Sequence, residues 1–431
     1  MKVELLEILR KEVNPALGCT GPTSVSFAVS KAKDIVGGIP KEVTVIMDRD
    51  TYKNSISVGI PGTKEKGLDI AAALGAIAGK SNLGLEVLNY VTKDDEKKAL
   101  NMIDGNHVDV QIDWNRVGMG LYIDAKVKTN QGLGHAIVAK THTNVVYLEK
   151  NGEAILEKEF NDDKNAIYKA DHEIGGYKVK DFIDFSKEVP IEYLDFIKDA
   201  VDMNMKLAKI GMKKGSGEGF GKAWLKIGEK SPLYKAKAYT ASASDARMKG
   251  ENLPAMSCAS SGNVGITASI PLTIMADEEN CSEEKMVRSV ALSFLITIYV
   301  KNYIGRLSPM CACAIAASLG VAAGTAYLLN ETDEEIDRSI TNVIGSIGGI
   351  LCDGAKNGCA LKLSNAIGIA IESAYLAKIG VSIADGDGLV CKTADDSIKI
   401  LGKIAREGMR ETDIVMCKEI ISRNNETKEV D

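Results

Sequence analysis

The hydrophobic periodicity of this chain changes once along the sequence, and the change predicts two regions of different structure. Between residues 41 and 156, short runs rich in β-branched side chains alternate apolar and polar positions, as strands with one buried face do. The expected strands are residues 42–47, 107–112, 120–127, 135–139 and 144–148. A helix is expected among them, over the Ala-rich residues 67–80.

From residue 191 onward, apolar residues recur with a helical period instead. The expected helices are residues 191–210, 282–304, 311–329, 333–350 and 361–379. We therefore predict the fold class α+β. Its parts are an N-terminal α+β domain over residues 1–160, a connector over 161–190 and a mainly all-α domain over 191–431.

The composition is that of a globular protein of 431 residues, and it argues against some classes of partner. A net charge of −6 disfavours binding to nucleic acid or to an anionic membrane, because both need clustered Lys and Arg. The first ten residues predict an amphipathic helix, with charges throughout and without the apolar core of a secretion signal. We expect a cytoplasmic protein that acts on a small molecule, with no nucleic-acid or membrane partner.

One uncharged run could be mistaken for a membrane span. Residues 310–329 are twenty positions without a charge, and Gly320 and Gly324 form a GxxxG pair typical of membrane helices. The run is mostly Ala, however, with Ser, Thr and two Cys, so its total hydrophobicity is low. We expect a buried central helix.

Nine cysteines are many for a cytoplasmic chain. Their number is odd and no export signal is expected, so a disulfide framework explains them poorly. Metal binding, a reactive thiol, or burial as small apolar side chains remain as explanations.

The segment NPALGCTGP, residues 14–22, carries the first informative cysteine. A helix is expected to begin near Pro22, so Cys19 would lie close to a helix N-terminus. The positive end of the helix dipole favours the thiolate form of a cysteine, which is the reactive form. The alternative is an incidental cysteine in a Gly/Pro loop.

Four later cysteines form a second group: Cys311 and Cys313, then Cys352 and Cys359. If the first two are helical, their side chains point about 200° apart, so at most one faces a given site. Three such cysteines can hold three irons of a four-iron cluster and leave the fourth iron open. Zinc fits less well, because no CxxC pair or nearby His completes a site, and simple burial in a helical core stays open.

Three other segments carry weaker signals. Residues 260–265, SSGNVG, mimic the phosphate-binding loop of pyridoxal-phosphate dehydratases without the expected upstream Lys context, so they can bind an anionic group or form a simple turn. The Gly-rich residues 215–222 lack the pattern of a phosphate loop at Ser216 and Ala223, which predicts a flexible loop. His142 is a candidate for substrate binding or proton transfer.

Taken together, these segments resemble the L-cysteine desulfidase family, relatives of the alpha portion of iron–sulfur L-serine dehydratases. The resemblance covers nearly the whole chain and rests on several motifs in one order. The matching segments are NPALGCTGP (14–22), NSISVGIPGT (54–63), KTHTN (140–144), SSGNVGITASIP (260–271), the cysteine series and GMRETD (408–413).

The resemblance implies a [4Fe–4S] cluster with three cysteine ligands and one open iron, together with a catalytic cysteine base. Carried over residue by residue, the ligands are Cys311, Cys352 and Cys359, and the base is Cys19. The spacing to Cys352 favours Cys311 over Cys313 as the first ligand. We expect substrate contacts from the same motifs, at Thr20, Gly21, Asn54, His142, Asn144, Ser261 and Asn263.

The implied reaction is the non-redox β-elimination of L-cysteine to pyruvate, ammonia and sulfide. The Cys19 thiolate would remove the α-proton while the open iron, a soft Lewis acid, takes the substrate sulfur. The chain lacks the Ser-Ser-His motif of the separate dehydratase beta domain, which favours the desulfidase branch. Alternatives are an L-serine dehydratase, a pyridoxal-phosphate lyase and a non-catalytic metal-binding scaffold. We expect a homo-oligomer, most simply a dimer.

Overall fold

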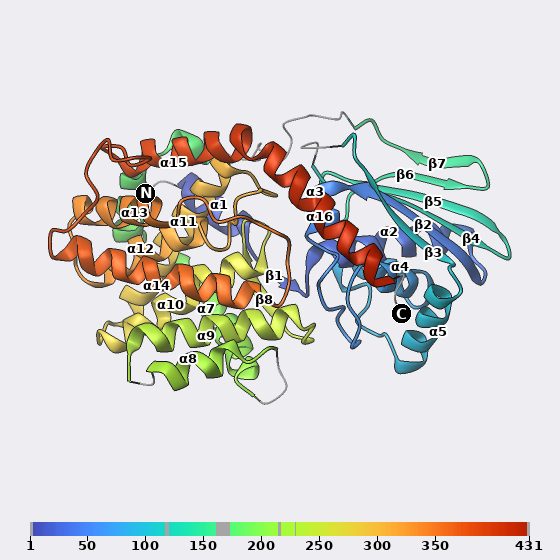
Figure 1. Ribbon diagram of the computed structural model, residues 1–431, viewed down its shortest axis with the longest axis horizontal. Coiled ribbons are helices and arrows are strands. Elements are labelled where there is room, and N and C mark those ends of the chain that lie inside the picture. Colours follow the sequence, from blue (N-terminus) through green and yellow to red (C-terminus); the bar gives the residue numbers. More distant parts are fainter. Residues whose placement is uncertain (1–2, 117–119, 161–172, 214–216, 229, 429–431) are drawn as a thin grey trace.

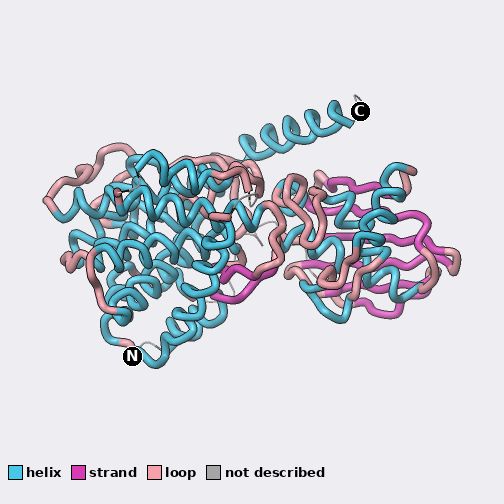
Figure 2. The backbone as a smooth tube through the Cα atoms, turned by 90° about the horizontal axis from the view of Figure 1, so that it is seen from below, coloured by secondary structure: helices cyan, strands magenta, loops and turns pink. Residues whose placement is uncertain are grey.

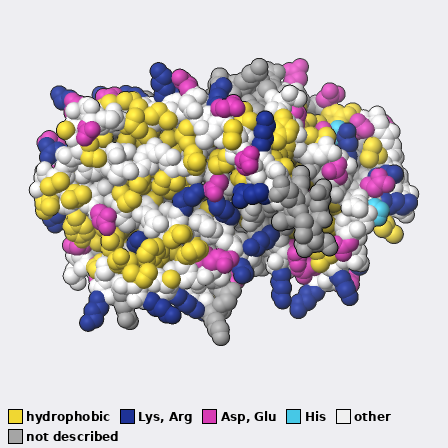
Figure 3. All heavy atoms as spheres, in the orientation of Figure 1, with side chains coloured by type: hydrophobic (Ala, Val, Ile, Leu, Met, Phe, Trp, Pro, Cys, Tyr) yellow, Lys and Arg dark blue, Asp and Glu magenta, His cyan; other side chains and the backbone are white. Residues whose placement is uncertain are grey.

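The computed structural model describes residues 3–116, 120–160, 173–213, 217–228 and 230–428. A sheet with its helices forms one end of the molecule and a group of packed helices forms the other (Figures 1 and 2), so the predicted α+β class is confirmed. On the face drawn in Figure 3, basic and acidic side chains occur side by side over both regions.

The sheet has six strands in the order β3-β2-β4-β5-β6-β7. Their bounds are β2 (Pro40–Asp48), β3 (Val108–Asp113), β4 (Tyr122–Thr129), β5 (Gly132–Ala139), β6 (Val145–Lys150) and β7 (Glu153–Glu157). β2 pairs with β3 in parallel, and the other pairings are antiparallel. The five predicted strands are all present. β7 was not predicted, because its side chains are mostly exposed and show no alternation.

Helices pack on the sheet and carry the chain toward the second region. They are α2 (Thr20–Val36), α3 (Arg49–Lys53), α4 (Leu68–Ile77), the 3₁₀ helix η1 (Ser81–Glu86) and α5 (Lys93–Asp104). α2 lies against β4 and β5, and α4 lies against α2 and β3. The alternating Val43, Val45 and Met47 of β2 are buried there, as the sequence pattern requires.

The second region is helical. Its elements are η3 (Ile174–Gly176), α6 (Val179–Glu188), η4 (Ile191–Leu194), α7 (Asp195–Gly211), α8 (Phe220–Gly228), α9 (Pro232–Met248), α10 (Gly262–Glu278), α11 (Glu283–Ile304), α12 (Ala316–Leu328), α13 (Asp333–Ile347), α14 (Cys359–Lys378), α15 (Ala394–Lys403) and the π-helix η5 (Ile404–Gly408). The predicted connector is partly outside the described residues, at 161–172. Its remainder includes α6, which buries Phe182 and Phe185 in the helical core.

α12 lies at the centre of this region, in contact with α10, α11, α13 and α14. It is the predicted buried helix, although it begins at Ala316 and not at residue 311. A side chain at Gly320 would overlap the carbonyl of Ser293 on α11, so the GxxxG pair serves close helix packing. Among the described residues, no helix is long and apolar enough to cross a bilayer.

The two ends of the chain cross between the regions. α1 (Val3–Glu12) buries Leu5 and Leu9 in the helical core, and β1 (Val13–Leu17) then pairs antiparallel with β8 (Pro254–Cys258). α16 (Arg410–Lys428) leaves the helical region and reaches α3 on the sheet side (Figure 1). The domain boundaries predicted above stay a prediction, to which the structure adds that α1 packs with the helices.

Candidate active site

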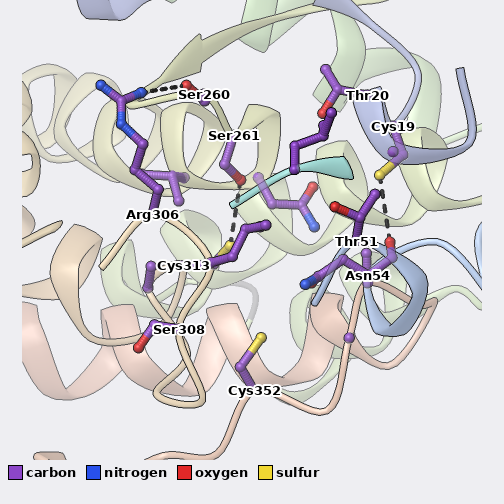
Figure 4. A pocket seen from close by; sticks show the side chains of 18 of the residues that line it. Cys19, Thr20, Thr51, Asn54, Ser260, Ser261, Arg306, Ser308, Cys313 and Cys352 are labelled. Carbon is purple, nitrogen blue, oxygen red and sulfur yellow. Dashed lines mark hydrogen bonds between the residues drawn. The ribbon is translucent and has the colours of Figure 1, made fainter. Parts of the chain in front are cut away.

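A cavity of about 440 Å³ lies where the sheet region meets the helical region (Figure 4). Both regions contribute to its walls. The predicted site residues that line it are Cys19, Thr20, Gly21, Asn54, His142, Ser261, Asn263, Cys311, Cys352 and Cys359. Asn144 is not among the lining residues; its side chain donates to the Ala139 carbonyl at 3.0 Å and braces the loop that carries His142.

Cys19 is the N-cap residue of α2 and is half-buried at the cavity wall. Its Sγ lies 3.7 Å from the carbonyl oxygen of Asn54, at the end of α3. Gly18 has φ +64° and lies so close to Pro61 that a Cβ would be 2.7 Å from its Cγ. A Cβ at Gly21 would overlap the hydroxyl of Ser55. The two motifs at residues 14–22 and 54–63 therefore pack directly against each other.

Cys311 and Cys313 lie in a turn that precedes α12. The N–H of Ala314 and that of Ile315 both donate to the Cys311 carbonyl, at 3.0 and 2.8 Å. Because the turn precedes the helix, the helical geometry that would point the two side chains about 200° apart does not apply to them. Both residues line the cavity.

Cys352 lies beside Cys311 because two extended segments meet. Cys311 N–H donates to Ile350 at 2.8 Å, and Cys352 N–H donates to Pro309 at 2.7 Å. Cys359 is buried at the first position of α14 and its Sγ lies 3.7 Å from the Gly354 carbonyl. Three short segments, two of them only seven residues apart, thus bring their thiols to one wall of the cavity.

The thiols on this wall interact with one another. Hydrogen bonding with Cys313 raises the pKa of Cys311 to about 12, and burial adds to the effect. Hydrogen bonding with Cys311 raises the pKa of Cys352 well above its usual value, and burial raises that of Cys359. These thiols are therefore protonated near neutral pH unless a metal binds them.

The donor set suits a soft iron–sulfur group, because several buried sulfur atoms face the same cavity. Within the described residues, however, no three His, Cys, Asp or Glu side chains are gathered as around one metal ion. A four-iron cluster binds each of its cysteines to a different iron, so it does not require three side chains gathered around one ion.

Lysines flank the cysteine wall. Burial opposes the charged form of Lys53, yet the neighbouring Cys352, Asp413 and Asp50 raise its pKa above the ordinary value. Lys53 Nζ lies 2.5 Å from Asp413 on α16, and Lys362 Nζ lies 2.5 Å from Asp353. These cations favour thiolate forms of the cysteines next to them.

A further part of the cavity wall is formed by the turn before α10 and by two basic side chains, Lys301 and Arg306. Lys301 Nζ donates to the Ala259 carbonyl at 2.6 Å. Arg306 donates to Ser260 Oγ at 2.8 Å and to the Glu12 carboxylate at 2.6 Å. Ser261 Oγ lies 3.8 Å from Cys313 Sγ (Figure 4).

His142 enters the cavity from the loop after β5. Burial, with a contribution from the charge of Arg306, lowers its pKa to about 4. Its imidazole is therefore neutral near pH 7 and can accept a hydrogen bond.

Comparison with known proteins assigns the chain to a family. A model of the serine dehydratase alpha chain matches residues 82–418, most of the chain. The chain belongs to the serine dehydratase alpha chain family. The resemblance drawn from the motifs is thereby confirmed at the level of the family.

Relatives resemble the chain over almost their whole length. A UPF0597 protein of Clostridium tetani is 42% identical over 422 residues, which cover 98% of this chain and 99% of that protein. A UPF0597 protein of Caldanaerobacter subterraneus subsp. tengcongensis is 43% identical over 414 residues, 96% of each chain. One of Clostridioides difficile is 36% identical over 433 residues, covering 99% of this chain and 100% of that one.

The serine dehydratase alpha chain match contains the cysteine wall but begins after Cys19. The Cys19 loop, α2 and α3 lie outside the matched residues and line the cavity from the sheet side.

Sequence reasoning missed several basic residues of this site, among them Arg247, Lys301, Arg306 and Lys362. Lys301 offered a usable signal, because it interrupts an apolar helical pattern and a lysine there must be buried with a partner. The Gly-rich residues 215–222 were expected to be a flexible loop; residues 215–216 lie outside the described part. Gly219 and Phe220 are held by Asp245, and Phe220 begins α8.

Proposed function

We propose that this chain is an L-cysteine desulfidase, a carbon–sulfur lyase that converts L-cysteine to pyruvate, ammonia and sulfide without net redox change. One observation carries the proposal: a single cavity has the Cys19 thiol on one wall and the thiols of Cys311, Cys352 and Cys359 on another. A β-elimination needs these two functions at a short distance, a base at Cα and a site that accepts the leaving group from Cβ.

Cys311, Cys352 and Cys359 would hold a [4Fe–4S] cluster with one iron left open. Such a cluster, when bound, supplies a soft Lewis acid for the sulfur of the substrate. Lys53 and Lys362 lie beside Cys352 and Cys311 and offset the negative charge of the thiolates. Cys313 is left as a neighbour of the first ligand.

Cys19 acts as the base. The Cys19 thiolate, at the N-terminus of α2, takes the α-proton from the bound amino acid onto Sγ. The Asn54 carbonyl, 3.7 Å away, then accepts the new S–H and keeps the sulfur oriented. The neutral imidazole of His142 is available as a hydrogen-bond acceptor for the substrate amino group.

Replacement of Cys19 tests this assignment. We expect Cys19→Ser, purified without oxygen, to keep the iron content of the wild type and to lose turnover by about 10²–10⁴-fold, because a serine hydroxyl is a far weaker base near neutral pH. Iron, sulfide and pyruvate are measured on the same sample, and exchange of the α-proton with deuterated solvent is followed by NMR.

Cys391→Ser, a half-buried cysteine that does not line the cavity, is the matched control. Loss of iron from Cys19→Ser would make Cys19 a ligand and overturn the assignment. Near-normal turnover with normal iron would make the loop structural.

A second candidate, L-serine dehydration, is favoured by the family itself. The same base and the same cavity serve both reactions, and only the leaving group differs. The ratio of kcat/KM for L-cysteine to that for L-serine decides between them, with a ratio above one expected.

A further inference from the structure

The turn that precedes α10 is held in an unusual backbone conformation. Cys258 and Ser261 exchange two backbone hydrogen bonds of 3.1 Å, which forces Ala259 and Ser260 to φ values of +47° and +66°. Residues other than glycine rarely adopt this left-handed conformation, and such residues gather at functional sites. Here the turn directs the first residues of α10, including Asn263 and Val264, into the cavity wall.

The N-terminus of α10 offers hydrogen-bond donors. α10 has 17 residues, and the N–H groups of its first turn have no acceptor within the helix. The side chain of the N-cap residue, Ser261, makes no capping hydrogen bond to them. Together with the helix dipole, such N–H groups favour an anion.

Arg247 lies directly over this turn. It is 5% exposed, and its guanidinium donates to Asn263 Oδ1 at 3.1 Å and to the Gly18 carbonyl at 2.7 Å. Its Nε has no hydrogen-bond partner within the described part of the chain. A Cβ at Gly262 would lie 2.5 Å from that Nε, so the glycine lets the guanidinium pack directly against the start of α10.

The hydrogen-bond partners of Arg247 distinguish it from two other basic residues of the cavity, Arg306 and Lys301. Arg306 is paired with the Glu12 carboxylate, and Lys301 is bound to the backbone of the turn. The hydrogen bonds described for Arg247 both go to neutral acceptors. A buried guanidinium whose hydrogen bonds go to neutral acceptors is costly, and a bound carboxylate would offset that cost.

We propose that Arg247 and the first turn of α10 bind the α-carboxylate of the amino-acid substrate. The inference rests on the proposed function, and it agrees with the chemistry of the elimination. In an α-amino acid the carboxylate is bonded to the carbon that loses the proton, so its site must adjoin the base. Arg247 meets this condition, because it binds the carbonyl of Gly18, the residue before Cys19.

Two thiol probes that differ in one end group test the site by calorimetry with the anaerobic holoenzyme. 3-Mercaptopropionate has a carboxylate and no amine, whereas cysteamine has an amine and no carboxylate. Arg247→Gln is expected to weaken binding of 3-mercaptopropionate by about 10–100-fold and to leave binding of cysteamine unchanged, since a charged hydrogen bond is lost. Arg247→Lys should recover part of the affinity for 3-mercaptopropionate, because lysine restores the positive charge but not the paired N–H donors of the guanidinium.

Gly262→Ala provides a test that keeps the charge. Its methyl group would press on Nε of Arg247, so the same selective loss of 3-mercaptopropionate binding is expected even if Arg247→Gln does not fold. Arg288→Gln is the matched control, because Arg288 is also largely buried and binds backbone carbonyls but does not line the cavity. It should bind both probes as the wild type does.

Unchanged 3-mercaptopropionate binding in folded Arg247→Gln would overturn the site, whatever the turnover. A selective loss in Arg306→Gln with none in Arg247→Gln would overturn it in favour of Arg306. A wild type that releases no sulfide from L-cysteine, but loses 3-mercaptopropionate binding through Arg247→Gln, would refute the proposed function and support the carboxylate site.

Discussion

The two walls of the cavity that carry cysteines differ in construction. On the sheet side, one half-buried thiol at the start of α2 faces a backbone carbonyl, in a loop shaped by two glycines. On the helical side, Cys311, Cys352 and Cys359 come from three segments, lie near one another and are shielded enough to have raised pKa values. In the proposed function, this difference separates a thiol that reacts from thiols that bind a soft metal group.

Removal of a proposed ligand should have the largest effect. Cys311→Ala, Cys352→Ala and Cys359→Ala are each expected to lose the iron, about four atoms per chain for a cubane cluster, and all activity. Iron analysis and the absorption of anaerobically purified protein provide the measurement.

Cys313→Ala sharpens this prediction, because Cys313 is hydrogen-bonded to Cys311 and yet is expected to keep both iron and turnover. A colourless Cys313→Ala beside a normal Cys311→Ala would reverse the choice of first ligand. An absorption band of a pyridoxal imine, with inhibition by hydroxylamine, would contradict the cluster altogether.

The next largest effect is expected from the buried ion pairs that join α16 to α3. Asp413 on α16 contacts Arg49 at 2.6 Å and Lys53 at 2.5 Å, and all three side chains are nearly inaccessible to solvent. Asp413→Asn removes one buried charge and leaves the cations poorly compensated, so the free energy of unfolding should fall by about 3–5 kcal/mol. Urea denaturation measures the change.

An exposed pair serves as the comparison for these buried pairs. Lys98 and Asp94 are 58% and 71% exposed, so Asp94→Asn should leave the urea midpoint as it is. Equal shifts for Asp413→Asn and Asp94→Asn would show that α16 does not fasten the two regions together.

A smaller effect is expected at the glycine of the Cys19 loop. Gly21→Ala places a methyl group against the Ser55 hydroxyl, and such overpacking typically costs about 1–3 kcal/mol. Turnover should fall while iron content stays normal, because only the sheet-side wall moves. The double variant Gly21→Ala/Ser55→Ala should regain most of the activity, and failure of that rescue would argue that Gly21 serves another purpose.

The last prediction concerns pH. Burial, with the charge of Asp50, raises the pKa of Asp48 to about 7, against 3.8 for an ordinary aspartate. The folded protein therefore holds a proton that the unfolded chain has lost, so this carboxyl makes stability decline as pH rises from about 4 to 7, with no further change above. Asp48→Asn keeps an N-cap side chain for α3 and should remove that decline in urea titrations at several pH values.

The strands and the buried helix could be predicted because their evidence is local. The alternation of apolar and polar residues predicted β2 to β6, and the uncharged Ala-rich run predicted that α12 is buried. The cysteines of the site could be found from their motifs. Their arrangement could not, since Cys311 and Cys313 occupy a turn that helical periodicity hides.

Contacts between distant residues escaped prediction for a physical reason. Arg247 meets Gly18 across 229 positions, and nothing in either segment's periodicity reports the other. The pairing of β1 with β8 is equally remote, and both strands are short. These contacts build the basic side of the cavity, which is why the sequence revealed thiols but not their cationic neighbours.

The ion pair between Lys53 and Asp413 also has a consequence for the order in which the site is made. The two residues are 360 positions apart, so at usual rates of translation roughly 20–70 s separate their synthesis. During that interval the Lys53 ammonium stays hydrated, because its partner Asp413 has not yet been synthesised. Lys53, which lies beside Cys352, gains this partner only after α16 has docked, so loading of the proposed cluster would follow translation.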